Sequence, residues 1–162
     1  MDYQLKRNIN NPETVLKRYL YWAIYVPEGS PQPDPAIINQ PELAHYVVDW
    51  GKSDDRASFA VQEDVVIGVC WSRCFSADEP GYGFISPDIP EISLAIHPDD
   101  RSRGIGTELL SELIEILRID YPAVSLSVSP GNPAIRLYRR AGFSIHTADQ
   151  DQLIMIKYLS FE

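Results

Sequence analysis

The sequence predicts a mixed α/β or α+β fold built around a central β-sheet. Along the chain, segments in which apolar and polar residues alternate, as in strands, are interspersed with segments whose apolar residues recur every three or four positions, as in helices. The clearest helix covers 104–119 and the clearest strand covers 124–128. With 162 residues, 44% of them hydrophobic, the chain is long enough for one domain with a sizeable core. We expect that domain to span 1–162, and no internal repeat is visible.

The first half begins with an alternating segment at 2–9, which we interpret as a strand. Asn11-Pro12 resembles an N-cap followed by proline at the first helical position, and helical spacing predicts a helix over 12–25. Five prolines between 27 and 41 predict a loop, because dense proline prevents regular structure. The expected elements that follow are a short helix at 41–50, strands at 57–62 and 65–75, and a second loop at 76–90.

The second half is more regular. Residues 91–96 alternate and predict a strand that leads into the helix at 104–119. Asn132-Pro133 predicts the start of another helix, which ends near Ala141 because Gly142 fits the position just after a helix. Strands at 143–147 and 152–159 complete the predicted order.

Composition excludes several classes of protein. A formal net charge of −9 disfavours nucleic acid as a partner and is compatible with a cationic acceptor such as an amine. No apolar run approaches the ~20 residues that cross a bilayer, and the first residues lack a secretory signal, so we expect a cytoplasmic protein and no membrane partner. Cys70 and Cys74 in one strand would lie ~13 Å apart, too far for a disulfide. No second Cys/His pair completes a ligand set, so we expect no metal.

The most informative segment is the turn at 97–107, which joins the strand at 91–96 to the helix at 104–119. Gly104 and Gly106 let the backbone approach a ligand closely. The free amides and the dipole at a helix start favour an anion, and Arg101 and Arg103 add positive charge nearby. Taken alone this pattern is weak, because glycines also serve to ease tight turns. It lacks the third glycine of a dinucleotide site and the lysine of a P-loop.

Two motifs together resemble the GNAT superfamily of N-acyltransferases. Arg101-x-x-Gly104-x-Gly106 matches that family's Arg/Gln-x-x-Gly-x-Gly/Ala signature, and the family's second motif resembles residues 132–143, from Asn132 through Tyr138 to Phe143. The resemblance implies a mixed sheet of about six or seven strands, about four flanking helices and a splayed pair of parallel strands. It also implies acetyl-CoA as cosubstrate.

The resemblance places the cofactor along the strand at 91–96 and the glycine turn. Pantetheine is expected against the strand backbone, with 124–128 as the opposite wall, and pyrophosphate on amides 102–107. Asn132 fits a family asparagine near the thioester, although Asn before Pro is also a good N-cap. The expected cofactor-binding residues are Leu94, Ala95, Ile96, Arg101, Ser102, Arg103, Gly104, Ile105, Gly106, Thr107 and Asn132. For both arginines, contact with phosphate and simple solvation are alternatives.

Two residues are candidates for catalysis. Tyr138 would act as the general acid that protonates the departing thiolate, and the alternative is an ordinary core aromatic. Glu91 would act as the general base that deprotonates the amine, and the alternative is a solvated glutamate at a strand start. The resemblance also implies that two regions wall the acceptor pocket, and ordinary core packing is the alternative for most of their aromatic residues. These regions contain Tyr21, Trp22, Tyr25, Trp71, Arg73, Tyr82, Phe84 and Asp88.

The function expected from this resemblance is transfer of an acetyl group from acetyl-CoA to a primary amine by direct attack. The acceptor would be a small amine or a peptide amine, and a homodimer is possible on this evidence. Two rival readings stay open. One is a module that binds acyl-CoA without catalysing transfer, and the other is a nucleotide-binding domain that uses the same turn.

Overall fold

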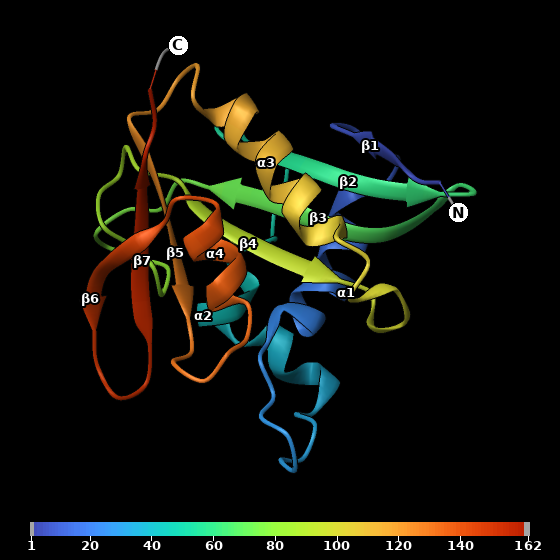
Figure 1. Ribbon diagram of the computed structural model, residues 1–162, viewed down its shortest axis with the longest axis horizontal. Helices are drawn as coiled ribbons and strands as arrows, with labels where there is room; N and C mark the ends of the chain where they lie inside the picture. Colours follow the sequence, from blue (N-terminus) through green and yellow to red (C-terminus); the bar gives the residue numbers. More distant parts are fainter. Residues whose placement is uncertain (1, 161–162) are drawn as a thin grey trace.

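A computed structural model describes residues 2–160 and shows a seven-stranded sheet flanked by helices (Figure 1). The elements of the first part are β1 (Gln4–Lys6), α1 (Pro12–Ala23), the 3₁₀ turn η1 (Pro35–Asn39), α2 (Pro41–Ala44), β2 (Arg56–Gln62) and β3 (Val65–Arg73). Those of the second part are β4 (Glu91–Ile96), η2 (Pro98–Asp100), α3 (Ile105–Leu117), β5 (Ala123–Val128), α4 (Ile135–Arg140), β6 (Ser144–Ala148) and β7 (Leu153–Tyr158).

The strand order in the sheet is β1-β2-β3-β4-β5-β7-β6. All neighbouring strands run antiparallel except β4 and β5, which are parallel. This mixed sheet with four α-helices confirms the predicted fold class, and β4 runs over the residues that the alternating pattern predicted.

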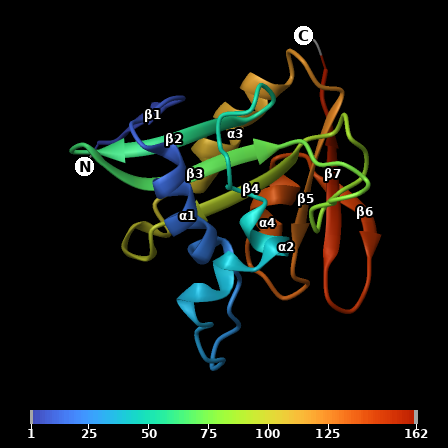
Figure 2. The same ribbon diagram turned by 180° about the vertical axis from the view of Figure 1, so that it is seen from behind.

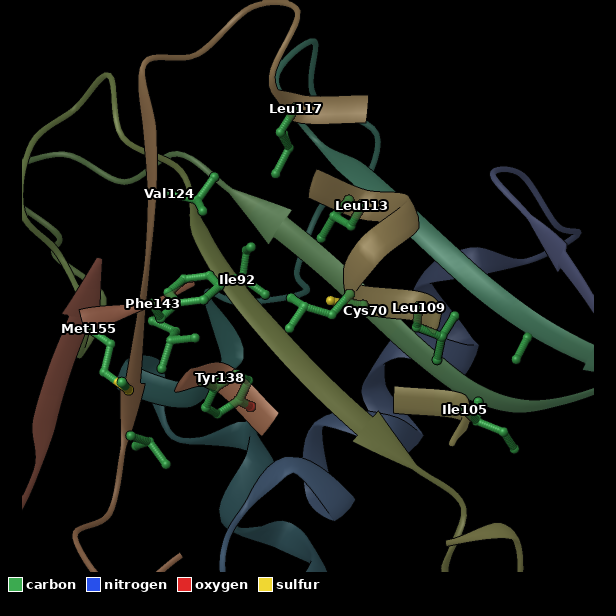
Figure 3. Packing of buried hydrophobic residues seen from close by; sticks show 14 of the residues in the cluster. Cys70, Ile92, Ile105, Leu109, Leu113, Leu117, Val124, Tyr138, Phe143 and Met155 are labelled. Atoms are coloured by element: carbon green, nitrogen blue, oxygen red, sulfur yellow. The ribbon is translucent and has the colours of Figure 1, made fainter. Parts of the chain in front are cut away.

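Helices cover both faces of the sheet. Figure 1 shows α3 and α4 in front of the sheet, and Figure 2, seen from behind, shows α1 and α2 on the opposite face. Each face has its own apolar cluster. The α3/α4 side buries Ile105, Leu109 and Leu113 against strand residues such as Cys70 and Val124 (Figure 3). The other side buries Leu16, Tyr19 and Leu20 of α1 with Phe59 and Trp71.

The parallel pair is joined at one end only. Glu91 pairs with Ser125, and the Ser125 amide donates to the Pro90 carbonyl at 3.0 Å. Beyond this point β4 and β5 diverge, so the backbone of β4 after Glu91 faces a gap rather than a neighbouring strand (Figure 1). Backbone groups in such a gap need other hydrogen-bond partners, and a ligand can supply them. The expected splayed pair is therefore present.

Some predicted elements differ in extent. The first strand covers three residues instead of eight, and the helix expected at 41–50 keeps one turn before the chain continues in turns that bury Tyr46 and Val47. Asn11 occupies the N-cap position of α1 with φ 52°, and its side chain makes no capping bond. Cys74 lies just beyond the end of β3, so the two cysteines are not in one strand. The described part of the chain contains no helix long and apolar enough to span a bilayer.

Candidate active site

A groove of about 600 Å³ opens beside the free part of β4. One wall is formed by Leu94, Ala95 and Ile96, which are three of the residues expected to contact pantetheine. The C-terminal end of α1 with the segment to Val26, and residues 132–134 just before α4, also line the groove. The groove thus follows the gap that the diverging strands create.

Arg101, which begins the glycine turn, lines this groove, whereas residues 102–107 do not. Ser102 and Gly104 have φ values of 65° and 80°, and this left-handed pair bends the chain sharply into α3. Gly104 is the N-cap of α3, and its carbonyl accepts from the Glu108 amide, so the amides of 105–107 precede the first helical bond. Such amides at the positive end of a 13-residue helix are suited to hold an anion.

The two arginines of the turn take different positions. Arg101 lines the groove, and its Nε donates to the Ile96 carbonyl at 3.4 Å. Arg103 instead pairs with Asp100 at 2.7 Å and donates to Gln62 at 3.2 Å. Of the two, Arg101 is the cation that faces the groove, and Arg103 belongs to a local network on the β2 side.

A second cavity, of about 380 Å³, continues the groove toward the point where β4 and β5 join. The two spaces share Ala23, Ile24, Tyr25, Leu94 and Asn132 as lining residues. Glu91 lies in the second cavity, at the vertex of the diverging strands. The two cavities therefore connect the Arg101 side chain, a groove lined by β4 and a buried carboxylate.

Glu91 is 4% exposed and has an unusual environment. Burial raises its pKa to about 7, although the Tyr46 hydroxyl and the nearby Gly83 amide favour the ionised form. Tyr46 donates to Oε2 at 2.5 Å, and within the described residues Oε1 has no hydrogen-bond partner. A carboxyl group whose pKa lies near neutrality can accept a proton at working pH and release it again.

Neighbouring segments fix the position of this carboxyl group. The Tyr46 oxygen accepts from the Tyr82 amide at 2.8 Å, which holds the tyrosine in its donating orientation. The loop between β3 and β4 packs so closely here that a Cβ on Gly83 would lie 2.8 Å from the Leu126 carbonyl carbon. Ser125 secures the same loop by donating to the Gly83 carbonyl at 2.8 Å. The carboxyl group is thus held by β4, β5 and two loops.

Tyr138 lies on α4, and its side chain is 8% exposed within the apolar cluster of the α3/α4 side (Figure 3). Its ring contacts Phe143 edge-on with centroids 6.0 Å apart. Burial raises the pKa of its phenol, so the group stays protonated at neutral pH. It lines neither cavity, whereas Asn132 lines both. Asn132 Oδ1 accepts from the Ala134 amide at 2.9 Å, which closes a turn just before α4.

Comparison with known proteins gives one decisive match. The sequence profile described as the Acetyltransferase (GNAT) family matches residues 18–143, which is most of the chain. The protein belongs to the GNAT family. Comparison with curated protein sequences gives no significant match.

Solved structures with the GNAT fold resemble this chain along nearly its whole length. One is YncA, a putative acetyltransferase from Salmonella typhimurium with its cofactor acetyl-CoA: 18% identity, TM-score 0.71, covering 100% of this chain and 96% of that one. Another is ribosomal-protein-alanine N-acetyltransferase from Brucella melitensis, with 23% identity, TM-score 0.67 and coverage of 96% and 99%. PaiA N-acetyltransferase from Thermoplasma acidophilum, in complex with coenzyme A, has 18% identity, TM-score 0.70 and coverage of 98% and 99%.

The residues expected to wall the acceptor pocket of this GNAT protein divide into two groups. Tyr25 and Tyr82 line the cavity that holds Glu91, and Tyr21 and Trp22 line the adjoining groove. The other four lie elsewhere. Trp71 and Phe84 pack in the apolar cluster under α1, Asp88 is exposed in a loop, and Arg73 makes a buried ion pair with Asp55 at 2.8 Å. Arg73 stands opposite Glu91 in the strand register, but its guanidinium turns to Asp55, and Trp71 packs among the α1 residues, so a place on the correct strand did not bring either side chain to the cavity.

The lining residues that escaped the sequence reasoning include Tyr46, Asp151 and Gln152. Tyr46 lies in the segment that was expected to be a plain helix, and it reaches Glu91 across 45 residues of sequence. Asp151 and Gln152 lie in the turn between β6 and β7. A turn of polar residues carries no periodic signal, so only the folded arrangement shows that it borders the cavity.

Proposed function

We propose that this GNAT protein transfers an acetyl group from acetyl-CoA to a primary amine by direct attack. The observation that carries the proposal is the path along β4, from Arg101 at the start of the glycine turn, past the strand backbone that has no neighbouring strand, to the buried carboxyl group of Glu91. The residues present fit coenzyme A. Amides at the start of α3 and Arg101 suit its pyrophosphate, and the open strand edge suits the amides of pantetheine.

When bound, acetyl-CoA supplies an acetyl group activated as a thioester. Arg101, Gly104, Ile105, Gly106 and Thr107 hold its phosphates in this proposal, together with the amides of 102 and 103. Leu94, Ala95, Ile96 and Asn132 then hold the arm that carries the thioester. Most of the acceleration comes from fixing the amine against the acyl carbon, because correct orientation alone can lower a barrier by several kcal/mol.

Glu91 is the proposed general base. An amine with pKa near ~10 arrives protonated at neutral pH and must lose a proton before its nitrogen can attack. The unpartnered Oε1 of Glu91 receives that proton, directly or through a water molecule. Because its pKa is about 7, the ionised form is available at neutral pH and remains basic enough to act.

Tyr138 is the proposed general acid that returns a proton to the departing thiolate. Its raised pKa keeps the phenol protonated until it is needed. Its depth in the core favours the rival reading in one respect, since a tyrosine that serves only packing is buried in the same way. A chain that binds acyl-CoA and catalyses nothing is therefore the second candidate.

Two measurements, made one after the other, test the proposal. Calorimetric titration of coenzyme A should give micromolar binding that Gly104→Glu/Gly106→Glu abolishes, whereas binding that survives the double substitution places the phosphates elsewhere. Thiol release from acetyl-CoA is then followed across a panel of amines for the wild type and Tyr138→Phe. A loss of at least ~100-fold in kcat with unchanged coenzyme A affinity supports the acid role. Equal rates remove that role, and no turnover with any amine indicates a silent module.

A further inference from the structure

The charges along the two cavities are segregated. Among residues 2–160, the lining of the cavity at Glu91 contains two carboxylates, Glu91 and Asp151, and no lysine, arginine or histidine. The basic side chain that lines the adjoining groove is Arg101, at the phosphate end. An acceptor that enters the Glu91 cavity therefore meets negative charge and no cationic partner for an acid group of its own.

The nearest cationic groups are engaged elsewhere. Arg73 stands opposite Glu91 in the strand register, but its guanidinium makes two bonds to Asp55, of 2.8 and 3.0 Å, and donates to the carbonyls of His45 and Val48. Burial lowers the pKa of His45, whose ring packs against Phe75. Arg73 cannot turn to an acceptor without leaving the buried Asp55 carboxylate unpaired, and the His45 ring is packed against Tyr46 and Phe75.

Much of the remaining lining is apolar, and several of its polar groups are already hydrogen-bonded. Apolar side chains come from α1, η1, α2 and β4: Leu20, Ala23, Ile24, Ile37, Leu43, Ile92 and Leu94. Three of the polar side chains are engaged within the protein. Ser127 donates to Gln152, Gln152 donates to the Tyr82 carbonyl, and Tyr25 donates to the Gly131 carbonyl. A peptide backbone or a sugar would compete with these internal hydrogen bonds.

We propose that the acceptor is a small primary amine on an uncharged apolar or aromatic body, and that the site rejects amines that also carry a carboxylate or phosphate. This inference rests on the proposed acetyl transfer. The cavity of about 380 Å³ matches a small ligand. The ammonium is drawn to Glu91 and Asp151, the body packs on the apolar wall, and an acid group on the body is repelled and left unpaired.

Matched pairs of acceptors that differ by one carboxylate test the proposal. Phenethylamine is compared with phenylalanine, and tyramine with tyrosine, by thiol release at saturating acetyl-CoA. The amine of each pair is expected to have a kcat/KM at least ~100-fold above its amino acid. Phenylalanine amide, in which a neutral polar amide replaces the carboxylate, should have a kcat/KM between those of the amine and the amino acid. An amino acid that equals its amine, or a short peptide that exceeds every amine, overturns the proposal.

Binding measured without turnover separates this proposal from the function on which it rests. With coenzyme A present, phenethylamine should raise the melting temperature and phenylalanine should not. If the amine binds selectively and no acceptor is acetylated, the acceptor class stands and the transfer is refuted. If both compounds bind alike, the acceptor class is refuted whatever the enzyme does with them.

A pair of charge-reversing variants locates the effect. Asp151→Lys puts a cation at the rim of the cavity and should narrow the ratio of amine to amino acid by about 10-fold. Asp78→Lys makes the same change in net charge at an exposed residue that lines neither cavity. It should leave the ratio unchanged. Equal shifts in both variants would mean that the overall charge sets the preference, and the local argument would fail.

Discussion

Replacement of Glu91 by glutamine should change how the stability of the protein depends on pH. In the folded state the pKa of Glu91 is raised by burial from 4.5 to about 7, whereas the unfolded chain returns it to its ordinary value. Between these two values the unfolded state binds fewer protons than the folded state. The free energy of unfolding therefore falls as pH rises through this window and levels off above it. The full difference is on the order of 3 kcal/mol.

The assay is urea unfolding at pH 5.5 and pH 8, which covers about 2 kcal/mol of that difference. Between these two pH values the free energy of unfolding of the wild type should fall by this amount more than that of Glu91→Gln, because glutamine carries no charge at either pH. Glu28→Gln, which changes an exposed glutamate, should behave as the wild type. Glu91→Gln should also lose acetyl transfer while it keeps its coenzyme A affinity. Equal pH dependence in Glu91→Gln and the wild type would refute the claim that burial raises this pKa.

Three further substitutions test other parts of the structure. Tyr46→Phe removes the hydrogen-bond donor to Glu91 and should shift the rising limb of the pH profile of kcat/KM about one to two pH units higher. An unshifted limb would show that the 2.5 Å bond does not lower the pKa of the base. Asp55→Asn leaves Arg73 buried without a countercharge and should lower the free energy of unfolding, measured in urea, by about 3–5 kcal/mol. Glu112→Gln breaks an exposed pair with Arg7 and should lower it by less than about 1 kcal/mol, so that similar losses in the two variants would contradict the argument. Gly106→Ala should raise helix stability by about 1 kcal/mol and preserve coenzyme A binding measured by calorimetry, because the new Cβ would lie 3.5 Å from Leu94 and 3.6 Å from Leu137. Loss of binding would mean that a phosphate lies against this position.

Local patterns in the sequence account for much of the fold and for one half of the site. Glu91–Ile96 and Ile105–Leu117 follow from alternation and helical spacing, because each buries one regular stripe of apolar residues. The turn between them follows from Gly104, whose positive φ is a local requirement. These are short-range features, and a sequence displays them directly.

The environment of Glu91 could not be read in this way. Its partner Tyr46 lies in a segment whose helix stops after one turn, and the contact depends on how α2 packs over the sheet. The same holds for Asp151, which reaches the cavity only because β7 returns beside β5. Such contacts are set by tertiary packing, which overrides local propensity. Motif matching named Glu91 as a candidate, and only the fold shows that it is enclosed.

The single rung between β4 and β5 makes the sheet two blocks, one of four strands and one of three, with a seam between them. An occupant that bonds the free edge of β4 acts as a further strand and couples the blocks mechanically. A ligand that binds only the folded state raises the free energy of unfolding, by ~2.7 kcal/mol when its concentration is a hundred times its Kd. Proteolysis and hydrogen exchange at the seam should therefore become slower as the ligand concentration rises. The lifetime of the protein would then depend on the concentration of the ligand that fills the seam.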